Sequence, residues 1–484
     1  MIHPKIISRI IGLLLLIEAF FLSGTFGLSL YYGEGITNAY IYTLLAIVVA
    51  ALLFLYYGRG KDRNISRKDG YIVVSSCWIV FSVFGSMPFV FSGCIPSVTN
   101  AFFETMSGFT TTGATILDNI EAMPHSLLFW RALTHWMGGL GIVFFTVAVL
   151  PIFGMGDIHL FAAEATGPIH GKLHPRISVT ARWILTIYIS LTIIGAVCMK
   201  FAGMGIFDAV CHAMSTIATG GFSTKQASIA AYNSPLIEYI VILFMFLGGT
   251  NFSLLYLSIF KGKFGELFRD SEFKTYGNII LVATVGIAIG LLLTTTIDVE
   301  RAFRDSLFQT VATVTTTGFS TTDYMLWHPL LWFVISALMY TGACSGSTTG
   351  AMKCVRVAIL GRVMLNEFKR IVHPNAIIPV RMSRKIITTP VQSAILAYTV
   401  LYVGVVVVGV FVNMAFGLDF MEAYGLSVSC TSNVGPALGG YGPAFSMDAL
   451  PEVLKWFASF QMLVGRLEFF AVLLMLTPMF WRRQ

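Results

Sequence analysis

Long apolar stretches alternate with short polar or basic ones along the chain, and this pattern predicts its helices. A helix that crosses a bilayer needs about 20 apolar residues. Ten stretches meet that length, at about 10–32, 37–58, 71–93, 127–153, 180–203, 234–260, 277–297, 328–360, 388–416 and 452–481. Four shorter apolar segments, each followed by residues rich in Gly, Thr and Ser, lie near 99–109, 207–217, 302–314 and 420–430. We therefore predict an all-α integral membrane protein with ten transmembrane helices.

The composition supports this fold class. Of the 484 residues, 56% are hydrophobic and only 11% are charged, whereas a water-soluble domain has about 25% charged residues. A soluble protein and a receptor with a single membrane anchor are both excluded. The seven cysteines are scattered and include no CxxC pair, so we predict neither a disulfide framework nor a zinc site.

Positively charged residues are distributed unevenly between the loops that this layout creates. Membrane proteins concentrate Lys and Arg in their cytoplasmic loops. Of the 31 Lys and Arg, 24 fall on the side of the N-terminus and Arg466 lies within a helix. The six on the opposite side are Arg131, Lys200, Lys225, Arg301, Arg304 and Lys455. Both termini are therefore predicted to be cytoplasmic. The net charge of +7 reflects these basic cytoplasmic loops. We therefore predict the lipid bilayer as a partner and no nucleic acid.

The four short segments align without gaps on a single glycine and reveal an internal repeat. The aligned segments are 100–113, 208–221, 305–318 and 422–435. Each repeat contains a spanning helix, a short segment, a glycine-containing stretch and a second spanning helix. We place an N-terminal two-helix segment at 1–69 and the four repeats at 70–160, 161–270, 271–386 and 387–484.

Three columns of this alignment indicate a pore. The first column suits the positive end of a helix dipole, so each short segment is predicted to begin there as a capped half-helix: Asn100, Asp208, Asp305 and Glu422. Small residues recur five places on, where two helices would pack closely: Thr105, Ala213, Thr310 and Ser427. The glycine ends each half-helix in irregular backbone, which survives at membrane depth only inside protein or beside water. One such stretch could be ordinary small-residue packing, but four around one axis would line a pore.

The half-helices also predict the charge of the permeating species. Each one would enter from outside and point its partly negative C-terminal end at the pore axis. The carbonyl oxygens that follow could replace the hydration shell of a monovalent cation. Glycine adopts positive φ without a Cβ penalty, which lets successive carbonyls face the same side. No side-chain charge is required for such a site.

These motifs resemble those of a known family over essentially the whole chain. The most specific are FTTTGAT at 109–115, TTTGFST at 315–321, NVGP at 433–436 and GRLE at 465–468. The chain resembles the Trk-type membrane subunit of the Trk/Ktr/HKT superfamily of potassium transporters, because two helices precede the four repeats. The resemblance implies a filter whose backbone carbonyls bind K⁺, formed by Thr111, Thr112, Gly113, Thr219, Gly220, Gly221, Thr316, Thr317, Gly318, Asn433, Val434 and Gly435. Four glycines imply preference for K⁺ over Na⁺, although the fourth filter departs from the Thr-rich pattern.

The second helix of the third repeat is interrupted, which we interpret as a difference from the other three repeats. The run 341–350 contains three glycines among Ser and Thr residues, and each glycine costs a helix about 1 kcal/mol relative to alanine. A broken helix directly below the filter could close the pore, or it could be a packing kink with no moving part. The resemblance implies a gate formed by Gly342, Ser345, Gly346, Ser347, Thr348, Thr349 and Gly350.

Arg466 is predicted to lie near the middle of the membrane. It follows Lys455 by eleven residues in the last predicted helix, or roughly 16 Å at 1.5 Å per residue. A charge at that depth is costly unless it is paired or faces water. We predict that Arg466 faces the pore below the filter, where it repels cations or contacts the gate. An interhelical salt bridge is the alternative.

Two further polar residues lie within predicted helices. Glu18, in the first spanning helix, is predicted to make a structural polar contact. His212, in the second half-helix, is predicted to be a packed, hydrogen-bonded histidine rather than a metal ligand.

The function predicted from these features and this resemblance is potassium uptake across the bacterial cytoplasmic (inner) membrane. Conduction down the electrochemical gradient is favoured because no transport-coupling site is visible, and Na⁺- or H⁺-coupled K⁺ symport is the alternative. A polytopic membrane enzyme is the rival from another class, but the nine histidines form no cluster with acidic residues. The resemblance further implies a homodimer and a separate cytoplasmic nucleotide-binding regulator of the TrkA type. The chain itself has no nucleotide-binding glycine fingerprint, so K⁺ is the ligand that we predict for it.

Overall fold

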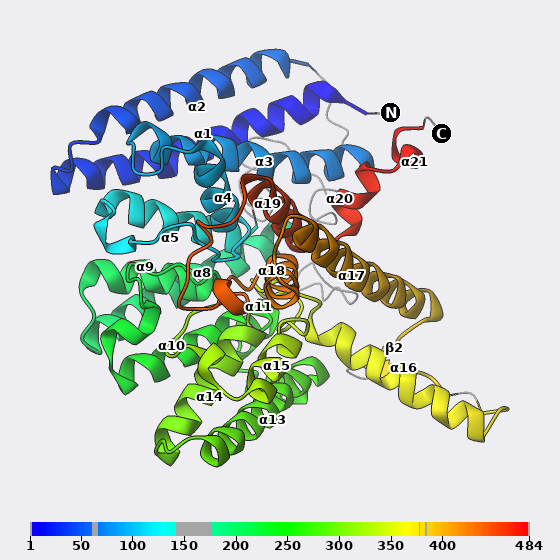
Figure 1. Ribbon diagram of the computed structural model, residues 1–484. Coiled ribbons are helices and arrows are strands. Elements are labelled where there is room, and N and C mark those ends of the chain that lie inside the picture. Colours follow the sequence, from blue (N-terminus) through cyan, green and yellow to red (C-terminus); the bar gives the residue numbers. More distant parts are fainter. Residues whose placement is uncertain (1, 61–65, 142–176, 377, 383–384, 483–484) are drawn as a thin grey trace.

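The computed structural model describes residues 2–60, 66–141, 177–376, 378–382 and 385–482. Within these ranges the protein is helical, as predicted, apart from a short antiparallel hairpin of β1 (Arg381–Met382) and β2 (Lys385–Ile386). Two long helices open the chain, α1 (Pro4–Tyr32) and α2 (Thr37–Tyr57), and they pack along each other at one edge of the molecule (Figure 1).

After α2, one order of elements recurs four times. A long helix comes first in each case: α3 (Arg67–Phe91), α8 (Ile177–Phe201), α13 (Ser271–Thr294) and α17 (Thr389–Ala415). A half-helix follows: α4 (Val98–Phe109), α9 (Ile206–Ile217), α14 (Val299–Val314) and α18 (Phe420–Ser432). A 3₁₀ turn comes next: η1 (Ile120–Ala122), η3 (Ser228–Tyr232), η4 (Tyr324–Leu326) and η5 (Gly439–Tyr441). The last helix of each set is α5 (His125–Gly139), α10 (Pro235–Gly248), α15 (Pro329–Leu338) or α19 (Glu452–Arg466).

This order matches the predicted repeat, while the repeat boundaries stay predictions. The boundary at 160/161 lies outside the described residues. The remaining described helices continue the last helix of a set or connect two sets. They are α11 (Phe252–Ile259), α12 (Phe264–Arg269), α16 (Cys354–Val372), α20 (Phe470–Met475) and α21 (Pro478–Trp481).

Fewer uninterrupted spans than predicted are found in the described ranges. Six helices are long and apolar enough to cross a bilayer, namely α1, α2, α3, α8, α13 and α17. The pair α10 and α11 forms a seventh candidate span that is bent by 105°. The predicted spans 328–360 and 452–481 are divided into shorter helices. Only the α5 part of the predicted span 127–153 can be placed, because residues 142–176 lie outside the described part.

The second and fourth repeats also have a broken second helix, so the prediction that only the third repeat is interrupted is wrong for the described residues. The second helix of the second repeat also breaks, at Gly249 and Thr250, and Asn251 then caps α11 by accepting a hydrogen bond from Ser253 N at 2.8 Å. In the fourth repeat the helix breaks after Arg466, where Glu468 and Phe469 have φ of 55° and 50°. The interruption therefore belongs to the architecture of the repeat rather than to the glycine content of one segment.

Both described ends of the chain lie beside the start of α3. The backbone N–H of His3 donates to Asp69 Oδ1 at 2.8 Å, and the Lys68 ammonium donates to the carbonyl O of Phe480 at 2.6 Å. The two ends therefore lie on the same side of the protein (Figure 1). The predicted topology requires this arrangement because it places both termini on one side of the membrane.

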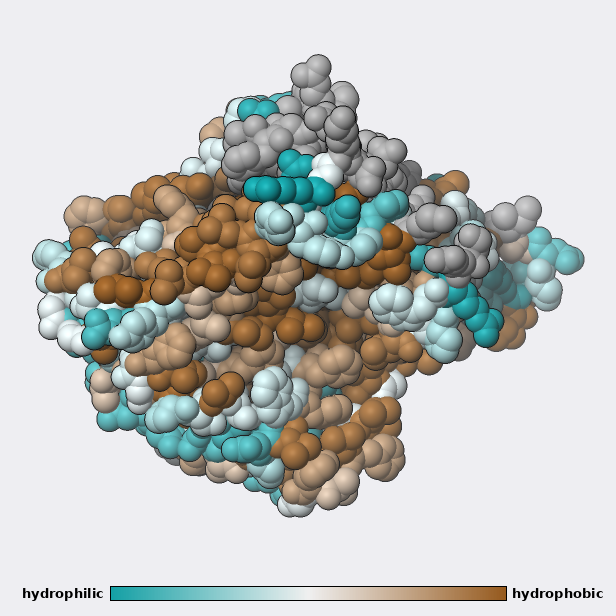
Figure 2. All heavy atoms as spheres, turned by 90° about the horizontal axis from the view of Figure 1, so that it is seen from above, coloured by the Kyte–Doolittle hydropathy of each residue, from teal (hydrophilic) through white to brown (hydrophobic). Residues whose placement is uncertain are grey.

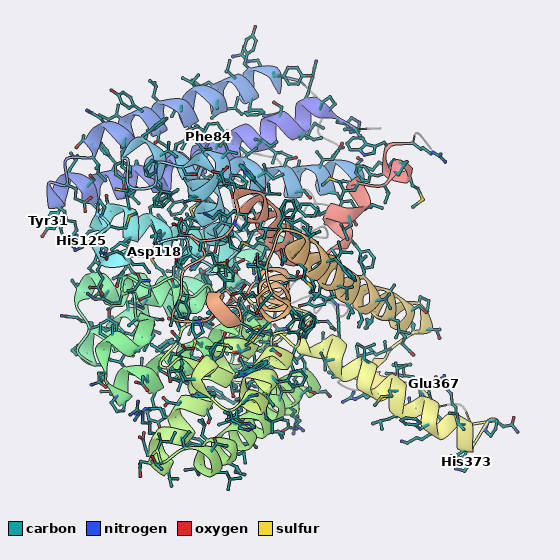
Figure 3. All side chains as sticks on the ribbon, in the orientation of Figure 1. Tyr31, Phe84, Asp118, His125, Glu367 and His373 are labelled. Carbon is teal, nitrogen blue, oxygen red and sulfur yellow. The ribbon has the colours of Figure 1, made fainter. Side chains whose placement is uncertain are left out.

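Large apolar side chains cover much of the outer surface. On α2, Leu45, Leu52 and Leu53 are each more than half exposed, at 62%, 57% and 64%. Figure 2 shows wide apolar areas on the face seen from above. Exposed apolar surface of this extent is typical of contact with lipid or with another protein. One helix, α16, projects from the bundle and carries Glu367 and His373 toward its far end (Figure 3).

Candidate functional site

The half-helices begin before the residues that the alignment predicts as their caps. Ser97, Asp298 and Asp419 cap α4, α14 and α18, because each side chain accepts a hydrogen bond from a backbone N–H of the first turn. The aligned residues instead lie three or seven positions inside their helices: Asn100, Asp208, Asp305 and Glu422. The N-cap prediction is wrong because every half-helix begins earlier than the aligned column, 16 residues before the shared glycine in the first, second and fourth repeats and 20 before it in the third.

The column of small residues packs as predicted in two repeats. A Cβ added to Gly85 of α3 would lie 2.9 Å from Thr105 Cγ2 of α4. A Cβ added to Gly409 of α17 would lie 3.0 Å from Ser427 Cβ of α18. A glycine facing a small residue lets each half-helix approach the long helix before it closely.

Every half-helix ends in the same irregular backbone. The residue that follows the helix cap, or forms it in the fourth repeat, has a left-handed conformation: Thr111 (φ 52°), Thr219 (54°), Thr316 (53°) and Asn433 (56°). The next N–H bonds back to a carbonyl five residues earlier at 2.8–3.0 Å: Thr112 to Ser107, Gly220 to Ser215, Thr317 to Ala312 and Val434 to Ser429. This pair of features defines a Schellman motif.

The fourth segment therefore shares the backbone of the other three despite its different sequence. Asparagine adopts the left-handed conformation more readily than other residues with a Cβ, which accounts for Asn433 at this position. A β-branched residue is rarely found there, so Thr111, Thr219 and Thr316 are held by their surroundings. Strain of this kind concentrates at binding sites.

The aligned glycines also have positive φ, as predicted, at 82°, 85°, 73° and 100° for Gly113, Gly221, Gly318 and Gly435. The residue before each glycine does not have positive φ. Each three-residue segment thus alternates between a left-handed residue, an ordinary one and a left-handed glycine. Alternation of this kind turns successive peptide groups so that neighbouring carbonyls can face the same side.

Contacts between these segments close a ring. A Cβ added to Gly113 would collide with the carbonyl O of Gly220, and one added to Gly221 would collide with that of Thr317. Likewise, Gly318 abuts the carbonyl O of Val434, and a Cβ on Gly435 would lie 2.6 Å from the carbonyl O of Thr112. Each glycine therefore faces the carbonyl that precedes the glycine of the next repeat, and the fourth repeat returns to the first. We call the twelve residues of the four segments the carbonyl ring: 111–113, 219–221, 316–318 and 433–435.

Side chains of the carbonyl ring point into the protein. The five threonines of the ring and Asn433 are buried, whereas Gly113, Gly221 and Gly318 keep partial exposure. The Asn433 amide donates to Thr112 Oγ1 and to the carbonyl O of Met462, both at 2.9 Å. The sequence-predicted filter residues are thus brought together in one place, with their side chains buried.

The interrupted segment 339–353, which we call the loop, lies against this ring. Thr348 Oγ1 donates to Ile217 O at 3.0 Å, and Gly350 N donates to Thr316 Oγ1 at 2.9 Å. Ala351 N donates to Ser432 O at 3.0 Å. Because Ile217 and Ser432 end α9 and α18, the loop contacts the C-terminal ends of two half-helices.

The other predicted gate residues shape the loop itself. Gly342 and Gly346 have φ of 65° and 74°, which favours glycine. Ser347 Oγ donates to Cys344 O at 2.6 Å and lies 2.9 Å from Thr349 Oγ1. Ser345 instead bonds outside the loop, because its backbone N–H and hydroxyl both donate to Glu272 of α13.

Arg466 joins the loop to the first repeat. Its Nη1 donates to the carbonyl O of Thr348 at 2.6 Å, and its Nη2 donates to the carbonyl O of Gly138 in α5 at 2.7 Å. Nearby Glu468 pairs instead with Arg356, whose Nη2 lies 2.5 Å from Glu468 Oε2. Of the roles weighed for Arg466 from the sequence, contact with the loop is the one that these hydrogen bonds describe.

Sequence reasoning missed a buried ion pair beside the ring. Arg131, counted from the sequence only as a charge on the side opposite the N-terminus, is 2% exposed within α5, and its Nε lies 2.8 Å from Glu104 Oε1 of α4. The same carboxylate accepts a hydrogen bond from Ile116 N at 2.9 Å, and the guanidinium donates to Ser223 O at 3.2 Å. A carboxylate and a guanidinium inside apolar segments are expected to pair, and this signal could have identified them.

Glu18 and His212 give opposite outcomes. Both carboxylate oxygens of Glu18 are buried without a hydrogen-bond partner among the described residues, so the predicted polar contact is not found there. The Glu18 carboxylate lies close to Gly85 of α3, which has no side chain to bond it. His212 is packed and hydrogen-bonded as predicted, with Nδ1 2.8 Å from Asp208 O and Nε2 2.9 Å from Ser223 Oγ.

The fold and the carbonyl ring together define a class of protein. Half-helices that end inside an apolar protein, with irregular backbone facing a partly exposed centre, are typical of proteins that move ions or polar solutes across membranes. The molecule is a multi-pass membrane transport protein.

Comparison with known proteins names the family. The family described as TrkH, cation transport protein, matches residues 34–483, and this chain belongs to it. The chain is 34% identical to the Trk system potassium uptake protein TrkH of Salmonella typhimurium, over 99% of this chain and 100% of that one. It is 30% identical to the Trk system potassium uptake protein TrkG of Escherichia coli K12, over 99% of both chains. The crystal structure of the potassium transporter TrkH from Vibrio parahaemolyticus matches with a TM-score of 0.90 and 33% identity, covering 100% of each chain.

Proposed function

We propose that this protein takes up K⁺ across the bacterial cytoplasmic membrane through the carbonyl ring. The observation that carries the proposal is the closed contact between the four glycine segments, which supports one central pathway shared by all repeats. Family membership agrees with it, since relatives over the full length are potassium uptake proteins.

The chemistry of the ring suits a monovalent cation. Carbonyl oxygens carry partial negative charge and can replace water around an ion that gives up its hydration shell. The C-terminal ends of four half-helices add further negative potential. K⁺ binds its hydration water less tightly than Na⁺ or Li⁺ does, so a ring that offers only carbonyl dipoles favours K⁺ and Rb⁺.

Ion flux into liposomes that contain the purified protein tests this function. We expect K⁺ and Rb⁺ to pass and Na⁺ and Li⁺ to be excluded to a large extent. Currents that reverse at the K⁺ equilibrium potential would support conduction, whereas reversal that depends on a Na⁺ or proton gradient would support coupled symport. Equal flux of all four ions would contradict a selective ring.

The loop is proposed to be the gate of this pathway. It contacts three of the four repeats, through Ile217 at the end of α9, Ser432 at the end of α18 and Thr316 of the ring. Two glycines of the loop with positive φ, Gly342 and Gly346, interrupt any helix that it could form. Displacing the loop would open the path below the ring without moving the ring itself.

Arg466→Ala is expected to raise basal K⁺ flux. The guanidinium holds Thr348 O to Gly138 O, and a hydrogen bond to a charged group contributes about 1.5–3 kcal/mol. Loss of that bridge should therefore raise the open population by roughly tenfold or more, with the K⁺/Na⁺ preference kept. Arg466→Lys should be intermediate, because an ammonium lacks the planar fork that reaches two carbonyls. Flux and thermal stability are measured on the same samples, and a less stable Arg466→Ala protein with no increase in flux would contradict the bridge.

The same proposal includes the predicted partners. We propose a homodimer in the bilayer with both termini cytoplasmic, and a separate nucleotide-binding regulator that docks on the cytoplasmic side. The projecting helix α16 supports this, since Arg362, Lys369 and Arg370 make part of its surface basic. K⁺ is the proposed cargo, and no nucleotide is proposed to bind this chain.

A further inference from the structure

Three side chains with metal-binding atoms meet beside the loop. Cys344 belongs to the loop, Cys354 begins α16, and Glu272 lies in the first turn of α13. Their two sulfurs and a carboxylate oxygen all lie within 4.8 Å of one another, and Cys354 Sγ is 3.7 Å from Glu272 Oε1. All three residues are buried. The sequence hides this cluster, because Glu272 and Cys354 are 82 positions apart.

The separations fit a tetrahedral metal ion. Zinc binds thiolate at about 2.3 Å and carboxylate oxygen at about 2.0–2.2 Å, so neighbouring ligands stand about 3.5–3.8 Å apart. The present atoms would have to close by about 1 Å at most to reach that geometry. Two thiolates and one carboxylate favour Zn²⁺ or Cd²⁺ strongly over K⁺, which prefers neutral oxygen ligands.

Neighbouring groups already orient the three ligands. Ser345 N donates to Glu272 Oε1 at 2.5 Å, and Ser345 Oγ donates to Glu272 Oε2 at 2.8 Å. Cys344 N donates to Gly249 O at 3.0 Å, and Cys354 N donates to Ala343 O at 2.9 Å. Support of this kind around metal ligands raises affinity by fixing their direction.

We propose that Glu272, Cys344 and Cys354 form a binding site for Zn²⁺ or a similarly soft divalent cation, which holds the loop against α13 and lowers transport. On binding, each thiol releases its proton to water, the carboxylate supplies one oxygen, and a water molecule completes four ligands. The metal would join α13, the loop and α16 by coordination where hydrogen bonds now join them. The effect on transport rests on the proposed role of the loop as the gate.

Cadmium binding to the purified full-length protein tests the site without any transport assay. Cd²⁺ is titrated in a buffer with a phosphine reductant, and the ultraviolet cadmium–thiolate absorption is recorded. We expect one equivalent to bind the wild-type protein, with affinity at least about tenfold lower in Cys344→Ser and in Cys354→Ser. Cys77→Ser removes a buried cysteine of α3 and is the matched control, which should bind as the wild type does.

Two results would overturn the site. One is the lack of thiolate absorption in the wild-type protein, and the other is undiminished absorption in both serine variants of the cluster. Each variant is first checked for wild-type thermal stability without metal. Because two positions are tested separately, misfolding of one variant leaves the other to decide.

K⁺ flux with added Zn²⁺ then tests whether metal binding at this site lowers transport. Zn²⁺ should reduce flux roughly fivefold or more in the wild type and in Cys77→Ser, and Cys344→Ser should lose this sensitivity. Cadmium binding together with zinc-insensitive flux would overturn the proposal that the metal lowers transport. A protein that binds cadmium but carries no K⁺ even without metal would instead overturn the proposed function and leave the binding site supported.

Discussion

Gly113→Ala is expected to reduce K⁺ flux by about tenfold or more and to weaken the preference for K⁺ over Na⁺. A left-handed conformation costs a residue with a Cβ roughly 1–2 kcal/mol, and Gly113 has φ of 82°. The added Cβ would also collide with the carbonyl O of Gly220. The neighbouring repeat must therefore move its own carbonyl, so the damage spreads from one segment of the ring to the next.

The chain offers a matched control in Gly286 of α13. No atom lies within 4 Å of a Cβ placed there, and its φ is not positive. Alanine should improve helix propensity at this position by about 1 kcal/mol, with flux and selectivity unchanged. Reversal potentials in mixed K⁺ and Na⁺ measure both variants. If folded Gly113→Ala protein keeps wild-type flux and selectivity, the glycine does not belong to a selective ring.

Arg131→Ala should cause the largest loss of stability. The substitution leaves Glu104 as an uncompensated buried charge, and breaking a buried pair in this way costs about 3–5 kcal/mol. Arg131 also lies over the Phe222 ring, with its guanidinium carbon 4.1 Å from the centroid. The pair bonds Ile116 and Ser223, which follow Gly113 and Gly221 of the ring, so flux should fall together with thermal stability.

Removing both charges separates this electrostatic cost from lost packing. The double variant Glu104→Gln with Arg131→Met should recover much of the stability, because no unpaired charge is left. Arg370→Ala is the control, since Arg370 and its partner Glu367 are both exposed, at 45% and 54%. An exposed pair contributes at most about 1 kcal/mol. Equal melting temperatures for Arg131→Ala and Arg370→Ala would show that the buried pair does not stabilise the fold.

The interrupted helices show where local sequence stops being informative. The break near Gly346 can be predicted, because glycine disfavours helix wherever it stands. The break at Glu468 and Phe469 cannot, since neither residue opposes a helix and both have positive φ. Contacts made by the neighbours decide it: Glu468 pairs with Arg356 of α16, and Arg466 reaches the loop.

The sequence by itself determined the elements whose cause is local or periodic. The length of apolar stretches predicts the long helices, and the repeated glycine predicts where irregular backbone lies in all four repeats. Only the tertiary structure decided how these pieces meet. Thr111, Thr219 and Thr316 take a conformation that their own side chains disfavour, and each aligned glycine meets a carbonyl about a hundred residues or more away in the chain. The same holds for Glu104 with Arg131 and for Glu272 with its two cysteines, because burial makes polar groups find partners in space regardless of their separation in sequence.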